Sequence, residues 1–223
     1  MSSEAFRDCF DDRFASQKNK SAITFLRDGE VETRISYTAL DRDTDRMCHN
    51  LGSFGIEAGD RVILFLQKSL IFVVAHLALQ RLGAVSVPLN PGYKKSEMEY
   101  LLKDADPKAI FTEPWIGSFI NEIDPNLTII TVDTRIPYQE LDILDSVSDK
   151  IVPPHVEAHD PGLIIYTSGT TGNPKGAVLT QRNLKNDALN VINVWEINSS
   201  DVVCHALPLF HLHGLCFALH TAL

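Results

Sequence analysis

Three consecutive apolar segments constrain the fold of this chain more than any other feature. Residues 61–66 form a short, nearly continuous apolar run after the turn residues Gly59 and Asp60, which is typical of a buried parallel strand. Residues 70–82 are apolar on most sides and predict a helix that Gly83 ends, and residues 84–89 predict a second strand. A strand, a helix and a strand in this order predict a layered α/β fold with a mostly parallel sheet.

The rest of the chain continues this alternation. Apolar spacing predicts helices at 37–52 and 96–104, the second starting with a capping box of Ser96 and Glu99. Leu184, Ala188, Val191 and Trp195 mark one face of a later helix. Residues 137–159 are polar and acidic, which indicates a surface connection. Further strands are expected at 109–112, 127–132, 162–166 and 201–209.

Composition excludes several classes of protein. Asp and Glu number 29 against 20 Lys and Arg, a net charge of −9, which argues against a nucleic-acid-binding surface. The four cysteines have no C-x-x-C spacing, so neither a structural zinc site nor a disulfide framework is expected. The N-terminus has no apolar signal region, and the longest apolar stretch, 70–79, is interrupted by His76 and too short to span a membrane. We therefore expect a soluble cytoplasmic protein.

The segment from Tyr166 to Gly176, Tyr-Thr-Ser-Gly-Thr-Thr-Gly-Asn-Pro-Lys-Gly, directly follows a predicted strand. Glycines let the backbone approach a ligand and turn its amides inward, which makes a concave site for anions. The hydroxyls add donors, and Lys175 adds a positive charge. This combination predicts a polyphosphate-binding loop. It is not a Walker A loop, because Pro174 precedes the lysine and Gly176 follows it. The alternative is a Ser/Thr/Gly-rich surface turn, which seldom combines all these features.

This loop resembles the signature loop of the adenylate-forming superfamily, which includes acyl-CoA synthetases, firefly luciferase-like enzymes and peptide-synthetase adenylation domains. The resemblance extends along nearly the whole chain, over residues 59–64, 79–90 and 207–214. It implies that residues 1–223 are the incomplete N-terminal portion of the large domain of an acyl-CoA synthetase, without the C-terminal lid domain. Within the superfamily, residues 206–215 most closely resemble malonyl-CoA synthetases.

The resemblance also implies a mechanism. A carboxylate attacks the α-phosphate of Mg·ATP to give an acyl-adenylate and pyrophosphate, and a thiol, commonly that of CoA, then displaces AMP. Such chemistry depends on positioning and charge neutralisation. Carried over by position, His211 would flank the acyl group and the α-phosphate, and a loop threonine would reach the Mg²⁺. The β- and γ-phosphates would be held by Thr167, Ser168, Gly169, Thr170, Thr171, Gly172 and Lys175.

Two other interpretations of the histidines stay open. His211 and His213 would share one face if their segment were a strand, with His205 nearby, but no acidic or cysteine ligand accompanies them, so no metal site is predicted. His211 would otherwise be a hydrogen-bonded core residue. The remaining histidines are expected to be structural or on the surface, and Trp115 and Trp195 are expected to be packing residues.

A malonate enzyme would also need a basic side chain to pair with the distal carboxylate of malonate. We expect that residue after Leu223.

Residues 215–223 are apolar and end without a capping glycine or a polar tail. We therefore expect a truncated chain that lacks the adenine- and ribose-binding motifs, the C-terminal domain and a complete CoA tunnel, and that has little or no ligase activity alone. The alternatives are a shortened module that binds nucleotide or a partner protein without turnover, and a partial polypeptide with no function of its own. Neither the acid nor the thiol acceptor is specified.

Overall fold

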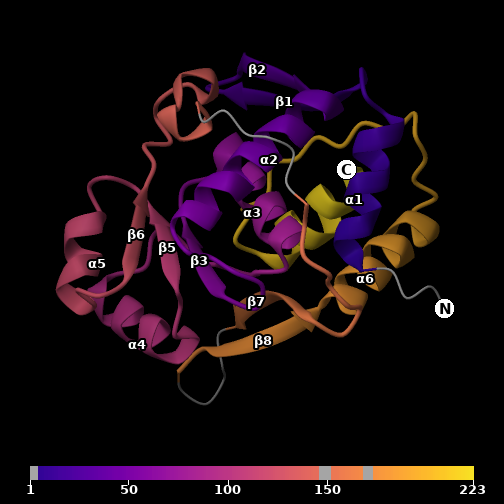
Figure 1. Cartoon of the computed structure of the whole chain (residues 1–223). Coiled ribbons are helices and arrows are strands. Elements are labelled where there is room, and N and C mark those ends of the chain that lie inside the picture. The colour runs from indigo at the N-terminus through magenta and orange to yellow at the C-terminus, as the bar shows by residue number, and fades with distance from the viewer. Residues whose placement is uncertain (1–4, 146–151, 168–172) are drawn as a thin grey trace.

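The computed structural model describes residues 5–145, 152–167 and 173–223. Its centre is a six-stranded sheet in the order β6-β5-β3-β4-β7-β8 (Figure 1). Every neighbouring pair is parallel except β7 and β8. The strands are β3 (Arg61–Phe65), β4 (Val85–Pro88), β5 (Ala109–Thr112), β6 (Thr128–Thr131), β7 (Pro161–Thr167) and β8 (Lys175–Thr180). The predicted α/β fold with a mostly parallel sheet is confirmed.

The β3-α3-β4 unit forms as its sequence predicts. Helix α3 (Leu70–Leu82) begins at Ser69, whose side chain accepts a hydrogen bond from the Phe72 amide, as an N-cap residue does. It ends at Gly83, whose φ of 69° is left-handed. A Cβ added there would lie 2.6 Å from the Val156 side chain, so glycine is required both by the backbone and by the packing.

Helices cover both faces of the sheet, and each face has its own apolar cluster. One cluster joins α2 (Tyr37–Ser53) and α3 to side chains such as Val62 and Leu64 of β3. The other joins α4 (Lys95–Ala105) and α5 (Gly117–Ile123) to Ile63 and Phe65. Figure 1 shows α2 and α3 near the centre and α4 and α5 at the lower left. Burial on both faces explains why residues 61–66 are apolar without alternation.

The first 36 residues contain one helix and two strands that the sequence analysis missed. Helix α1 (Phe6–Ser16) packs Phe6, Phe10 and Phe14 into the first cluster. Strands β1 (Ser21–Arg27) and β2 (Glu30–Ser36) form a separate antiparallel hairpin. Asp28-Gly29, with positive φ at both residues, joins the strands, and this dipeptide between apolar-containing runs is a recognised hairpin signal.

Several detailed predictions were wrong. Helix α4 begins at Lys95, earlier than expected, so Ser96 lies inside the helix. The capping carboxylate is that of Glu97, not Glu99, and it accepts a hydrogen bond from the Lys94 backbone amide. Residues 137–159 are not only a surface connection: η1 (Tyr138–Glu140) and η2 (Asp142–Leu144) bury Tyr138 and Leu144, because apolar residues are interspersed with the acidic ones.

Residues 201–209 form no strand. A strand needs a hydrogen-bonded neighbour, and none pairs with this segment in the part of the chain that the structure describes; the Val202 side chain is 93% exposed. Trp115 and Trp195 are exposed and do not pack into the core. Trp195 follows the end of α6 (Gln181–Val194). The Arg135 guanidinium carbon lies over the Trp115 ring, 4.0 Å from the centroid of that ring. No helix among the described residues is both long and apolar enough to cross a membrane.

Two buried histidines face each other beneath α1. His76 of α3 and His220 of η3 (His213–His220) place their Nε2 atoms 2.8 Å apart, and His76 Nδ1 lies 2.9 Å from Ser86 Oγ. The Phe6 ring covers His220. Burial lowers the pKa of His76 to about 3, and burial together with the His76 ring lowers the pKa of His220 well below its usual value. Both rings are therefore neutral near pH 7.

Acidification is expected to destabilise the protein through this pair. Below pH 6.5 the unfolded chain protonates both histidines and the folded chain does not, so the free energy of unfolding falls as the pH decreases, by about 1.4 kcal/mol per pH unit for each histidine. Urea unfolding from pH 7 to pH 4.5 measures this slope. His220→Phe should reduce the slope by about 1.4 kcal/mol per pH unit, the contribution of one histidine. An unchanged slope in His220→Phe would contradict the assignment.

Candidate functional site: a hydroxyl-rich hairpin loop and the segment 205–214

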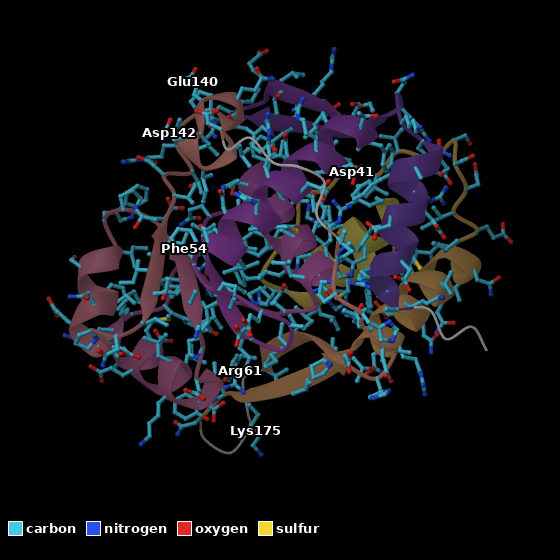
Figure 2. All side chains as sticks on the ribbon, viewed as in Figure 1. Asp41, Phe54, Arg61, Glu140, Asp142 and Lys175 are labelled. Carbon is cyan, nitrogen blue, oxygen red and sulfur yellow. The ribbon has the colours of Figure 1, made fainter. Side chains whose placement is uncertain are left out.

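The loop predicted to bind phosphate is the connection of an antiparallel hairpin. Thr167 ends β7, Lys175 begins β8, and the two residues are paired across the hairpin. Thr167 Oγ1 lies 3.5 Å from the Lys175 carbonyl oxygen. Both side chains are exposed, and Figure 2 shows Lys175 directed away from the body of the protein. Ser168, Gly169, Thr170, Thr171 and Gly172 lie outside the described residues.

The hairpin is built by two features of its strands. Along β7, Leu163 and Ile165 pack into the cluster under α3, and Ile164 and Tyr166 pack into the cluster under α4, as the alternation of a strand requires. On β8, a Cβ at Gly176 would lie 2.9 Å from Ile164 Cγ2. Glycine is thus needed for β8 to approach β7, which explains one glycine of the motif without any ligand.

Helix α3 fixes the start of the hairpin. Gln80 donates through Nε2 to the Gly162 carbonyl at 2.7 Å and accepts from Gln181 Nε2 at 3.0 Å. Both glutamine side chains are buried. A Cβ at Gly162 would lie 2.6 Å from Gln181 Nε2, so this glycine leaves room for the hydrogen bond between Gln181 and Gln80. Buried amides satisfied in this way hold β7 and the start of α6 in a single arrangement.

Helix α4 fixes the other end, next to the loop. The Tyr166 hydroxyl donates to Asp104 Oδ2 at 2.6 Å. The Tyr100 hydroxyl donates to the Pro174 carbonyl at 2.9 Å and lies 3.4 Å from Asp104 Oδ1. Tyr166 directly precedes Thr167, and Pro174 directly precedes Lys175. The two strands that enter and leave the loop are therefore both attached to one helix.

The second part of the site is the segment 205–214, which lies where the sheet changes direction. The chain passes from β3 to β4 on one side and returns to β5 on the other side of β3. In open α/β sheets, ligands bind at such a switch point, beyond the carboxyl ends of the strands. A pocket of about 210 Å³ lies there. Its walls come from residues that follow β3 and β4, from α3 and from the segment 205–214. They include Leu66, Gln67, Lys68, Phe72, Pro91, Pro208 and Phe210.

Specific contacts hold the segment 205–214 over this pocket. Lys68 Nζ donates to the His205 carbonyl at 2.5 Å, and His205 Nε2 lies 2.7 Å from the Gly214 carbonyl. A Cβ at Gly214 would lie 2.0 Å from the Pro208 carbonyl oxygen. Gly214 is therefore required by this close backbone approach. Partial burial also lowers the pKa of Lys68 from its usual value.

His211 lies on this segment beside the pocket. It is exposed and its ring packs against Phe210, with the centroids 4.4 Å apart, so it is not a buried core histidine. The described contacts do not join His211 to Thr167 or Lys175. His213 begins η3 and is not part of a strand. No cluster of three or more His, Cys, Asp or Glu side chains suited to a metal is found among the described residues.

Sequence reasoning missed α4 as part of the site. Tyr100 and Asp104 are four residues apart, so they share one face of the helix, but nothing in the sequence links that face to residues 166–174. It also missed β8. The first two residues of β8, Lys175 and Gly176, belong to the predicted loop, and no strand was predicted after them, although Val178 and Thr180 are typical strand residues.

The fold and the loop define an α/β protein whose parallel sheet carries a loop rich in hydroxyls and glycine with one lysine. The chain belongs to the AMP-binding enzyme family, whose family profile matches residues 10–223. An oxalate–CoA ligase of Arabidopsis thaliana is 36% identical over 175 residues, which are 76% of this chain and 34% of the ligase. A malonate–CoA ligase of the same plant is 30% identical, over 99% of this chain and 37% of the ligase.

The structural comparison agrees. The crystal structure of ATP-bound MatB from Rhodopseudomonas palustris matches with a TM-score of 0.85 at 31% identity, over 99% of this chain and 43% of that one. The chain thus spans between about a third and somewhat under half of the length of these relatives.

Proposed function

We propose that this chain supplies the N-terminal, nucleotide-binding portion of the large domain of an ATP-dependent carboxylate–CoA ligase that works through an acyl-adenylate. The observation that carries the proposal is the hairpin base, where Thr167 and Lys175 are paired at the two ends of the loop. This arrangement places a residue with a hydroxyl and a residue with an ammonium group at the two ends of one glycine-rich segment. Membership of the AMP-binding enzyme family supports the same function.

In this proposal the loop residues hold the β- and γ-phosphates of ATP. Lys175 neutralises charge on the leaving pyrophosphate, and Thr167, Ser168, Thr170 and Thr171 donate hydroxyl hydrogen bonds, while Gly169 and Gly172 let backbone amides approach. The carboxylate of the acid attacks the α-phosphorus, the bond to the β-phosphate oxygen breaks, and pyrophosphate leaves. The thiol of CoA then attacks the acyl carbon and AMP leaves. His211 flanks the acyl group and the α-phosphate.

Magnesium enters this proposal bound to ATP. The described residues offer no cluster of carboxylates or histidines for it, and a threonine hydroxyl of the loop is the hard oxygen ligand that this ion prefers. Its contribution is to neutralise phosphate charge.

The substrate we propose is malonate or another short acid. Similarity to a malonate–CoA ligase, to MatB and to an oxalate–CoA ligase supports it. A 4-coumarate–CoA ligase and an indoleacetate–CoA ligase match at comparable identity, 33% and 34%, so similarity alone does not select the acid. The alternatives are a medium- or long-chain fatty acid, and a module that binds nucleotide without turnover.

Carboxylate-dependent ATP–pyrophosphate exchange tests the proposal, with the longest native product of the gene and with malonate, oxalate, acetate and a long-chain fatty acid compared. We expect exchange with a short acid. Exchange with the fatty acid alone would support the proposed reaction but contradict a short acid as the substrate. A folded protein that binds ATP and shows no exchange with any acid would instead be a binding module. Residues 1–223 alone are expected to form little or no thioester.

A further inference from the structure

The loop is attached at both ends to the same face of α4. Tyr166 reaches Asp104 at 2.6 Å from the incoming strand, and Tyr100 reaches the Pro174 carbonyl at 2.9 Å on the outgoing side. Asp104 also lies 3.4 Å from the Tyr100 hydroxyl. We call the side chains of Tyr100, Asp104 and Tyr166 the α4 clamp.

The clamp has a rigid base. Met98, Leu101 and Leu102 of α4 are buried in the cluster that covers β3, β4 and β5. In contrast, the sheet gives the hairpin little support near the loop, because β7 pairs with β4 only at Ser86 and Leu163. The end of the hairpin is therefore held by β7–β8 pairing and by α4.

The hydroxyl groups of the clamp stay protonated near neutral pH. Burial, and after it the Asp104 carboxylate, raises the pKa of Tyr166 and of Tyr100. Each tyrosine thus remains a donor, and Asp104 is the acceptor for the Tyr166 hydroxyl.

We propose that the α4 clamp positions the polyphosphate loop, so that Tyr100, Asp104 and Tyr166 set the affinity for ATP without touching it. This inference rests on the proposed function of the loop. A preorganised loop binds phosphate more tightly because it loses less conformational freedom on binding. Loosening one attachment should therefore weaken binding of the β- and γ-phosphates and leave the carboxylate site unchanged.

Tyr100→Phe removes only the hydroxyl bonded to Pro174. We expect the KM for ATP in ATP–pyrophosphate exchange to rise about three- to tenfold, the range of one lost hydrogen bond, with the KM for the acid unchanged. Asp104→Ala removes the acceptor of the Tyr166 hydroxyl, the attachment on the incoming strand, and should also raise the KM for ATP. Asp104→Asn should recover part of the loss because its amide oxygen still accepts from Tyr166. Binding of AMP, which lacks the β- and γ-phosphates, should stay unchanged.

Tyr93→Phe is the matched control. Tyr93 packs on the same cluster, and its hydroxyl makes no hydrogen bond to the described residues. Melting temperatures of Tyr100→Phe and Tyr93→Phe should agree. An unchanged KM for ATP in Tyr100→Phe and Asp104→Ala, or equal rises in the KM of ATP and of the acid, would overturn the clamp.

The two proposals fail in different ways. If the wild-type protein shows no exchange with any acid, the proposed ligase function fails, and the clamp is then tested by equilibrium binding of Mg·ATP to wild type and Tyr100→Phe. Weaker binding by the variant supports the clamp, and equal binding contradicts it. A folded wild-type protein that does not bind Mg·ATP would contradict both.

Discussion

Lys175→Ala is expected to lower acid-dependent ATP–pyrophosphate exchange by about 10²- to 10³-fold, the effect typical of removing one group that stabilises charge in a transition state. Lys175 is the lysine of the loop, and no other Lys or Arg lies between Tyr166 and Gly176. Its side chain is exposed and directed away from the protein (Figure 2). The substitution should therefore leave the melting temperature unchanged, so that the loss is catalytic.

Lys18→Ala is the matched control, because Lys18 is also an exposed lysine but lies in the turn between α1 and β1. It should retain full exchange activity. Lys175→Arg keeps the charge with a different shape and should recover part of the activity. Full activity in Lys175→Ala, or an equal loss in Lys18→Ala, would contradict a role of the loop in the reaction.

Arg81→Met is expected to lower the free energy of unfolding by about 3 kcal/mol, as does the loss of one partner from a buried ion pair. The Arg81 guanidinium, 6% exposed, donates to Asp11 of α1 at 2.8 Å and to Asp41 and Asp45 of α2, each at 2.7 Å. Asp11 and Asp41 are partly exposed, so solvent limits the effect. The guanidinium also lies over the Phe14 ring, 5.3 Å from its centroid, so methionine removes this cation–π contact together with the ion pairs.

Urea unfolding measures this effect, and Lys95→Met is its control. Lys95 forms a 2.6 Å ion pair with Glu122 in which both side chains are at least half exposed, and such pairs contribute little to stability because solvent screens them. We expect a large loss in Arg81→Met and a small one in Lys95→Met. Equal losses would mean that the Arg81 network does not hold α1 and α2 to α3.

The parallel core could be predicted from the sequence because strands buried on both faces consist of apolar residues without alternation. Residues 61–66 and 109–112 are apolar without alternation, and Gly83 punctuates the helix between β3 and β4. These signals are local. The hydroxyls, glycines and lysine of the loop are likewise adjacent in sequence, so phosphate binding could be predicted without knowing the geometry, and it stays a prediction.

The other features could not be predicted because they depend on distant residues. Residues 201–209 have the apolar composition of a strand but lack a pairing partner among the described residues, so propensity alone gave the wrong result. The capping carboxylate came from Glu97 and not Glu99, because helix boundaries shift by a few residues without large cost. The α4 clamp joins Asp104 to Tyr166 across 62 positions of sequence, which no periodicity indicates.

Equilibrium binding of Mg·ATP and of AMP to the wild-type protein and to Lys175→Ala tests the central claim most directly, with the longest native product of the gene. If the loop holds the β- and γ-phosphates, Lys175→Ala weakens binding of ATP by about tenfold or more, the effect of one charge-assisted hydrogen bond, and AMP binds both proteins equally. Equal affinity of the two proteins for ATP, or an equal loss for ATP and AMP, would contradict that assignment.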